Sequence, residues 1–282
     1  MPLLVRRPVA PTRAGARLLE HAGSLLLRLD AARADLARMA VDPGQELTLA
    51  ASPLALPARS LAALPASGVT LHVLPREAIP AAVATGAVDL GLVDGLAAPS
   101  DPLRLPDVAP LTATGVAEEP LAVLLPVRHP LARRRGLRLG DLADARWLDA
   151  PAAGIPLDQL RAAAHGAPPA RGFRPALRYE GTDVRTLLAL VAAGHGLTLL
   201  PLSVARSADG TAPVPLTEPR LVHRIELLHG GMPDGSDAHA PAAAARPAPA
   251  PGGPARTVVQ ALLGLKSAAE GEVGTLETRT HT

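Results

Sequence analysis

TRAGARLLEHAGSLLLRLDAARADLARMA, from Thr12 to Ala40, is the stretch from which the organisation of this chain follows. Small or apolar residues recur along it alternately four and three positions apart, at Leu18, Ala22, Leu25, Leu29, Ala32, Leu36 and Met39. This heptad pattern, held for about three heptads, favours a coiled-coil helix. Thr12 is expected to cap the helix and Pro43-Gly44 to end it. So narrow a stripe calls for a partner helix, most simply that of a second copy; an amphipathic helix lying on its own domain is the alternative.

Composition limits the classes of function open to the chain. Its 282 residues allow one or two domains, at about 150 residues per domain. Without cysteine there is no disulfide, Cys-zinc site or Cys nucleophile. The only aromatic residues, Trp147, Phe173 and Tyr179, are too few to stack the bases of a single strand. Because no secretory signal and no run of about 20 apolar residues occurs, we expect a soluble, cytoplasmic protein with no membrane partner.

Strand-like and helix-like segments alternate after Gly44, which predicts a mostly parallel α/β sheet in two successive units, 45–115 and 119–205. The expected strands are 47–51, 69–74, 88–93, 108–113, 121–125, 146–149, 176–179 and 197–200. The expected helices are 57–64, 77–84, 139–143, 157–164 and 183–193. Closing strands are expected at 214–216 and 220–228, and a helix that returns to the body at 257–265. The Pro- and Ala-rich tract between them, 230–254, has too little apolar surface to fold by itself.

No catalytic or metal-binding constellation emerges from the sequence. The nine histidines form no i,i+4 pair on a predicted helix, so neither a metal nor another cofactor is expected. Glu118-Glu119 precedes a proline and predicts a solvated hinge in place of a general acid/base pair. Ala51-Ser52-Pro53 lacks the glycines of a nucleophile elbow. We therefore expect a protein that is not an enzyme.

Several short motifs occur in an order that resembles LysR-type transcriptional regulators. Pro2–Arg7 and Pro11–Ala22 resemble the end of the winged helix and the start of the linker helix of that family. Further matches are Val88–Val93, His129–Ala132, Leu190–Leu197 and Leu199–Pro201. The resemblance spans residues 2–229 and agrees with the heptad and with the strand–helix alternation.

The resemblance implies an α/β fold in which a long N-terminal dimerisation helix precedes a two-lobed effector domain similar to periplasmic binding proteins. It implies a wing remnant at 1–11, a linker helix at 12–42, an effector-binding domain at 45–265 and a disordered tail at 266–282. Lobe I is then expected at 45–118 and 206–265, and lobe II at 119–205. The implied partners are a second copy, in a homodimer or homotetramer, a small-molecule effector, and DNA.

Ligands of open parallel sheets bind outside the carboxyl ends of the strands, where helix N-termini present free amides. The expected effector-binding residues are therefore Ser52, Pro53, Asp94, Gly95, Asp149, Ala150, Pro201 and Leu202. Ser52 could alternatively only cap the following helix. No arginine falls at these strand ends, so we expect a small effector held by backbone amides, Ser52 and an apolar wall.

Members of the family carry a helix-turn-helix of roughly 50 residues before the position that matches Pro2, and that segment is absent from this sequence. Because such a helix reads base edges, we expect no specific operator binding by the chain as it stands. Arg6, Arg7 and Arg13 remain as phosphate contacts, which position a protein on DNA without reading its sequence. Either the start codon is placed too far downstream or the chain is a headless sensor. A stand-alone solute-binding protein of the same two-lobed fold is the alternative function.

Overall fold

The computed structural model describes residues 2–6, 9–19, 47–105, 111–164, 172–230 and 258–263, and positions 22, 26, 29 and 33 of the heptad stretch. Its first described part is an antiparallel hairpin of β1 (Leu4–Arg6) and β2 (Val9–Pro11), followed by helix from residue 13. Thr12 Oγ1 accepts a hydrogen bond from the Gly15 amide at 3.0 Å, which confirms the predicted cap. A Cβ on Gly15 would lie 2.0 Å from the Leu3 carbonyl oxygen, so hairpin and helix meet closely there.

The predicted heptad helix is helical at each of its described positions. Leu18 and Leu29 are 49% and 46% exposed, while Ala22 is half-buried. The other four heptad positions, Leu25, Ala32, Leu36 and Met39, lie outside the described residues, as does Arg7. The exposed leucines leave the predicted seam open to a partner helix.

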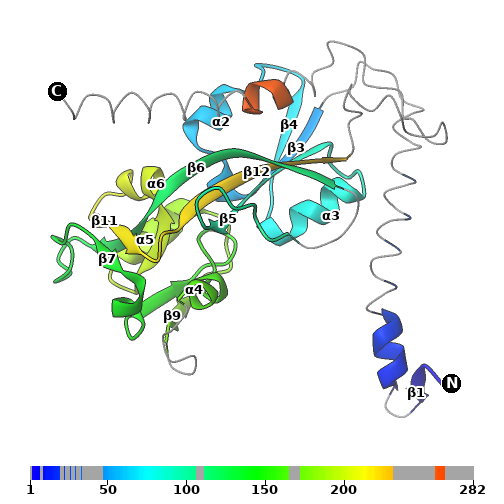
Figure 1. Ribbon diagram of the computed structural model, residues 1–282, viewed down its shortest axis with the longest axis horizontal. Helices are drawn as coiled ribbons and strands as arrows, with labels where there is room; N and C mark the ends of the chain where they lie inside the picture. The colour runs from blue at the N-terminus through cyan, green and yellow to red at the C-terminus, as the bar shows by residue number, and fades with distance from the viewer. Residues whose placement is uncertain are drawn as a thin grey trace.

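Lobe I is built from parallel strands with short helices between them (Figure 1). Its elements are β3 (Leu47–Ala51), η1 (Pro53–Ala55), α2 (Ala58–Ala62), β4 (Val69–Val73), η2 (Arg76–Ala78), α3 (Ile79–Ala84) and β5 (Leu90–Ala97). Every one of these elements except η1, which was not predicted, overlaps its predicted range because buried strands and breaker residues are local signals. Strand β5 differs at its end, because it continues to Ala97, whereas the expected strand ended at residue 93.

Lobe II carries the second α/β unit. Its elements are β7 (Leu137–Arg138), η3 (Leu139–Leu142), β8 (Arg146–Asp149), α4 (Leu157–Ala163), β9 (Arg174–Arg178), α5 (Val184–Ala192), β10 (Thr198–Pro201), α6 (Leu202–Arg206) and β11 (Thr211–Glu218). Asp183 caps α5 by accepting hydrogen bonds from the amides of Arg185 and Thr186. Gly194 ends this helical segment with φ +83°, a conformation that favours glycine.

Two long strands join the lobes, as Figure 1 shows: β6 (Leu111–Pro126) and β12 (Val222–Gly230) run antiparallel beside each other. The first half of β6 pairs with β12, and its second half pairs with β10 and β11 of lobe II. Glu118-Glu119-Pro120 therefore lies inside one continuous strand, in place of the solvated hinge that was predicted.

The strand directions correct the expectation of a mostly parallel sheet. The order is β4-β3-β5-β12-β6-β11-β7, with β3 parallel to both neighbours but β5, β12, β6 and β11 successively antiparallel. Strands β6 and β12, which carry the chain from one lobe to the other, run antiparallel, whereas a simple βαβ series predicts only parallel neighbours. The pairing of β11 with β6 also places residues 211–218 in lobe II, so the expected return to lobe I at residue 206 is too early.

Each lobe has its own buried core. In lobe II the core includes Trp147 and Phe173, whose ring centroids lie 5.5 Å apart. In lobe I, Val258 and Leu262 of the helical segment 258–263 are fully buried, which confirms that this late helix returns to the body. Within the described residues, no helix is both long and apolar enough to cross a membrane.

Candidate functional site

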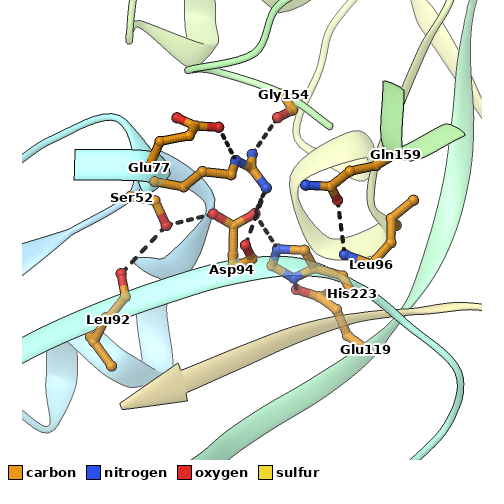
Figure 2. A network of polar contacts seen from close by, with 10 residues as sticks. Ser52, Glu77, Leu92, Asp94, Leu96, Glu119, Gly154, Gln159 and His223 are labelled. Atoms are coloured by element: carbon orange, nitrogen blue, oxygen red, sulfur yellow. Dashed lines mark hydrogen bonds and ion pairs between the residues drawn. The ribbon is translucent and has the colours of Figure 1, made fainter. Parts of the chain in front are cut away.

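A buried polar network lies where the lobes meet, centred on the carboxylate of Asp94 in β5 (Figure 2). Ser52, at the carboxyl end of β3, donates its hydroxyl to Asp94 Oδ1 at 2.5 Å. His223 of β12 places Nε2 3.0 Å from Asp94 Oδ2, and Arg76 of η2 places a guanidinium nitrogen 3.1 Å from the same oxygen. Three elements separated widely in sequence thus direct donors at one carboxylate.

These contacts keep Asp94 ionised despite its complete burial. Burial raises the pKa of its carboxyl group, but the Arg76 charge and the hydrogen bonds from His223 and Ser52 outweigh that effect. The result is a pKa lowered from 3.8 to about 2. Because an ionised carboxylate only accepts hydrogen bonds, His223 donates through Nε2–H. The group is therefore an anion held in place, not a proton donor near neutral pH.

Arg76 also joins the two lobes. Its second terminal nitrogen donates to the backbone oxygen of Gly154, in the loop that follows β8 of lobe II, at 2.5 Å. A second contact crosses nearby, where the Leu96 amide donates to Gln159 Oε1 of α4 at 3.3 Å. Leu54 of η1 is buried within the lobe II core. The lobes are therefore held together at this junction by one buried cation, one amide contact and apolar packing.

Glu119 extends the network along β6. Its Oε1 lies 3.8 Å from His223 Nδ1, and its Oε2 accepts from the Ser203 amide of α6 at 3.2 Å. His223 Nδ1 and Arg76 Nε are buried without a hydrogen-bond partner among the described residues. The network therefore retains two polar atoms with unused hydrogen-bonding capacity at the lobe junction.

A second ionic cluster lies one residue further along the joining strands. Arg224 donates to Glu226 at 2.7 Å and pairs with Glu118. Glu226 also accepts from the Leu103 amide at 3.0 Å, and Glu118 from that of Ser100. These contacts attach the segment that follows β5 to β6 and β12.

The structure brings together only part of the predicted site. Ser52 and Asp94 touch directly, and the Ser52 hydroxyl makes no helix-capping bond, so the capping alternative is wrong. Asp94 and Gly95 lie within β5, although a strand end was predicted there. Pro53 follows Ser52, while Pro201 and Leu202 directly precede Ser203, which binds Glu119.

Among the described residues Asp149 makes no contact with this network, whereas the Ala150 carbonyl accepts a hydrogen bond from the Gly154 amide at 2.8 Å. The carboxylate of Asp149 pairs at 3.0 Å with Arg178, which is 60% exposed, and Ala150 is buried. Arg178 also pairs with Glu180, and the two contacts raise the pKa of its guanidinium. The charge of Asp149 is thus already partnered on the lobe II side.

Sequence reasoning missed Arg76 and His223. Arg76 closely follows the carboxyl end of the parallel strand β4, so the same argument from strand ends that indicated Ser52 would also have indicated Arg76. Arg76 is thus part of the buried network around Asp94, although the sequence analysis expected no arginine there. His223 stands 129 residues from Asp94 on an antiparallel strand, and no local pattern indicates this contact.

Residues 41–230 match a family model described as the LysR substrate binding domain. The transcriptional dual regulator GltC of Bacillus subtilis (strain 168) is 30% identical over 112 residues, which are 39% of this chain and 36% of GltC. The chain thus matches about a third of the length of this relative.

Among solved structures, full-length BenM is similar with a TM-score of 0.55 and 22% identity, covering 96% of this chain and 84% of BenM. The structure of the BenM effector binding domain with its effector benzoate is similar with a TM-score of 0.54 and 20% identity, and the match covers 80% of this chain and 93% of that chain. At these identities the likeness demonstrates the fold.

Proposed function

We propose that this chain, which belongs to the LysR substrate-binding-domain family, is the sensing part of a LysR-type transcriptional regulator and binds a small-molecule effector between its lobes. The observation that carries the proposal is the contact from Arg76 of lobe I to Gly154 of lobe II. A small molecule that adds or removes one such contact changes the relative free energies of the closed and open lobes. Through that difference it shifts the population between them.

The proposed binding surface combines residues from both sides of the junction. Ser52, Pro53 and Gly95 contribute from lobe I, and Ala150, Pro201 and Leu202 from lobe II. Support comes from Gly95, where a Cβ would lie 3.8 Å from Gln159 Oε1 of lobe II. Asp94 and Asp149 belong to this surface as ion-paired groups. The proposal assigns no catalytic reaction and no resident cofactor to these residues.

Residues 12–42 are proposed as the linker helix that joins two or four copies, with the seam residues Leu18 and Leu29 exposed for that purpose. Arg6, Arg7 and Arg13 are proposed contacts to DNA phosphates beside a head domain of the kind that the family carries. Sequence-specific reading of the operator is assigned to that head. Such a regulator works in the cytoplasm, where we place this protein.

An effector screen tests the sensing role. Thermal unfolding is followed against matched sets of small carboxylates, their amides and the corresponding amines. We expect at least one compound to raise the unfolding temperature of the wild type and to lose that effect in Ser52→Ala. Ser60→Ala is the matched control, because Ser60 is likewise a buried lobe I serine but lies in α2. Equal binding by both variants would remove Ser52 from the site.

Light scattering and DNA binding test the remaining assignments. A dimer or tetramer is expected in solution, whereas a monomeric mass would favour a stand-alone solute-binding protein. Fluorescence anisotropy with the DNA upstream of the gene, over a salt series, is expected to show weak binding that does not distinguish this DNA from a random duplex. Tight, sequence-selective binding would show that some surface of this chain reads bases.

A further inference from the structure

We propose that Asp94 acts as a built-in ligand: its carboxylate fills an anion-binding cradle formed by Ser52, Arg76 and His223 at the lobe junction. It follows that the effector presents an uncharged polar group here, such as an amide or a hydroxyl, in place of a carboxylate. The statement about the effector rests on the proposed function above. The cradle itself does not, and it can be tested without any effector.

The donors around Asp94 are those that would bind a small free carboxylate. One hydroxyl serves Oδ1, while one guanidinium nitrogen and one imidazole nitrogen serve Oδ2, all within 3.1 Å. The side chains of Asp94 and His223 are fully buried, and that of Arg76 is 7% exposed. Charge-assisted hydrogen bonds in such surroundings are the strong ones. Ser52 follows β3, Arg76 lies in η2 and His223 lies in β12, so the cradle is assembled by the fold around one position. Figure 2 shows Ser52 and His223 directed at Asp94.

The backbone keeps Asp94 in the cradle. Asp94 lies opposite Ile225 in the β5–β12 pairing, and two residues earlier Leu92 is paired with Ala51 of β3. The Leu92 carbonyl also accepts from the Ser52 amide at 3.0 Å. With its Cα fixed by neighbours on both sides, Asp94 can withdraw its carboxylate only by rotating its own side chain. That rotation would leave the charge of Arg76 buried and unpaired, which is costly.

The charge balance excludes a second anion from the same place. Arg76 and Asp94 neutralise each other, and an effector carboxylate added beside them would be buried without a cation of its own. Two polar atoms at the junction still lack a hydrogen-bond partner among the described residues, namely Arg76 Nε and His223 Nδ1. Both atoms are buried here, with Glu77 4.0 Å from Arg76 Nε and Glu119 3.8 Å from His223 Nδ1, so an uncharged group would reach them, without disturbing the Arg76–Asp94 pair, as the lobes separate.

The test removes the built-in carboxylate and supplies a free one. Asp94→Gly is unfolded thermally in sodium formate, and in sodium chloride and formamide as controls for ionic strength and for the neutral analogue. At formate concentrations of about ten times its Kd, mass action favours the folded state by roughly tenfold. We expect this stabilisation in Asp94→Gly and not in the wild type. We expect it to weaken when Ser52→Ala is added.

Asp149→Gly is the matched control, because it removes a carboxylate that pairs with one largely exposed arginine. Formate should not stabilise it beyond chloride. If Asp94→Gly does not fold in chloride, the measurement becomes the yield of folded protein when this variant is refolded in formate. Asp94→Asn keeps the space of the side chain filled, so formate should not increase its yield. Absence of any formate effect on Asp94→Gly in both measurements would overturn the cradle.

The two proposals fail in different ways. If formate stabilises Asp94→Gly but no compound stabilises the wild type, the cradle is supported and the sensing role is not. If a carboxylate binds the wild type more tightly than its amide and loses that binding in Arg76→Met, sensing is supported and the inferred effector class is wrong. Preference for the amide supports both.

Discussion

Replacing Arg76 with methionine removes the buried cation at the lobe junction while keeping an apolar side chain of similar reach. The substitution leaves the fully buried Asp94 carboxylate with only Ser52 and His223 as donors. It also leaves the Gly154 carbonyl without the contact that crosses between the lobes. Arg76→Met therefore tests both the electrostatics of the site and the attachment of one lobe to the other.

The expected loss of stability is large. Removing one partner of a buried ion pair costs about 3–5 kcal/mol, since the other charge remains buried without compensation. With an m-value of about 2–3 kcal/mol/M in urea, this shifts the unfolding midpoint by roughly 1–2.5 M. The control is Arg178→Met. Arg178 is 60% exposed, so solvent screens its two ion pairs and a shift well below that of Arg76→Met is expected.

Urea unfolding monitored by Trp147 fluorescence measures this effect. Trp147 is the chain's one tryptophan and is fully buried, so its emission reports the lobe II core. Asp94→Asn and the double variant complete a double-mutant cycle. The double variant should be less destabilised than the two single losses together, because it leaves neither charge alone. Strict additivity, or a loss under about 1 kcal/mol for Arg76→Met, would refute the view that this pair holds the junction.

Three further predictions concern separate features. The pKa of Asp94 is lowered from 3.8 to about 2, so its ionised carboxylate stabilises the folded state above pH 3.8, and about 2 kcal/mol of this stability should be lost as the pH falls from about 4 to about 2. In urea titrations at each pH, Asp94→Asn should lack this part of the acid-induced loss. Identical pH profiles of wild type and variant would contradict the prediction. Gly91→Ala would place a Cβ 2.6 Å from Ile79 Cγ2 and should cost about 1–3 kcal/mol, whereas Gly140→Ala meets nothing within 4 Å and should leave the unfolding midpoint unchanged. Glu226→Ala should speed hydrogen exchange at the Leu103 amide, because it removes the carboxylate that accepts a hydrogen bond from that amide. The Leu74 amide, which donates to the Ala51 carbonyl, should keep its protection. Equal exchange at Leu103 in wild type and variant would show that this contact does not hold the segment after β5.

Local sequence signals were sufficient for most of the elements. Strand β3 has the predicted bounds, and the helices at 58–62, 157–163 and 184–192 lie within their predicted ranges. Their ends are marked by Pro57, by Pro156 and by Asp183, which limit or cap a helix through their own backbone or side chain. The Thr12 cap was predicted for the same reason.

Strand lengths depended on partners far away in the sequence. Strand β5 was expected to end at Val93, but it continues to Ala97 because β12 pairs with it along its whole length. Strand β6 was expected as two strands with a hinge at Glu118-Glu119, yet pairing first with β12 and then with lobe II strands keeps it continuous. Neither partner is visible in a window of neighbouring residues.

The sequence by itself determined the family and the alternation of strands and helices, and it predicted Ser52 and Asp94 near the ends of neighbouring strands, since each depends on residues adjacent in the chain. Only the tertiary structure decided which groups surround Asp94. His223 reaches it from 129 residues away because the antiparallel register of β12 against β5 brings His223 beside this carboxylate. Arg76 reaches both Asp94 and Gly154 because the fold sets the end of β4 against lobe II. Register and the packing of one lobe on the other are long-range properties, and they surrounded the Asp94 carboxylate with donors from distant parts of the chain.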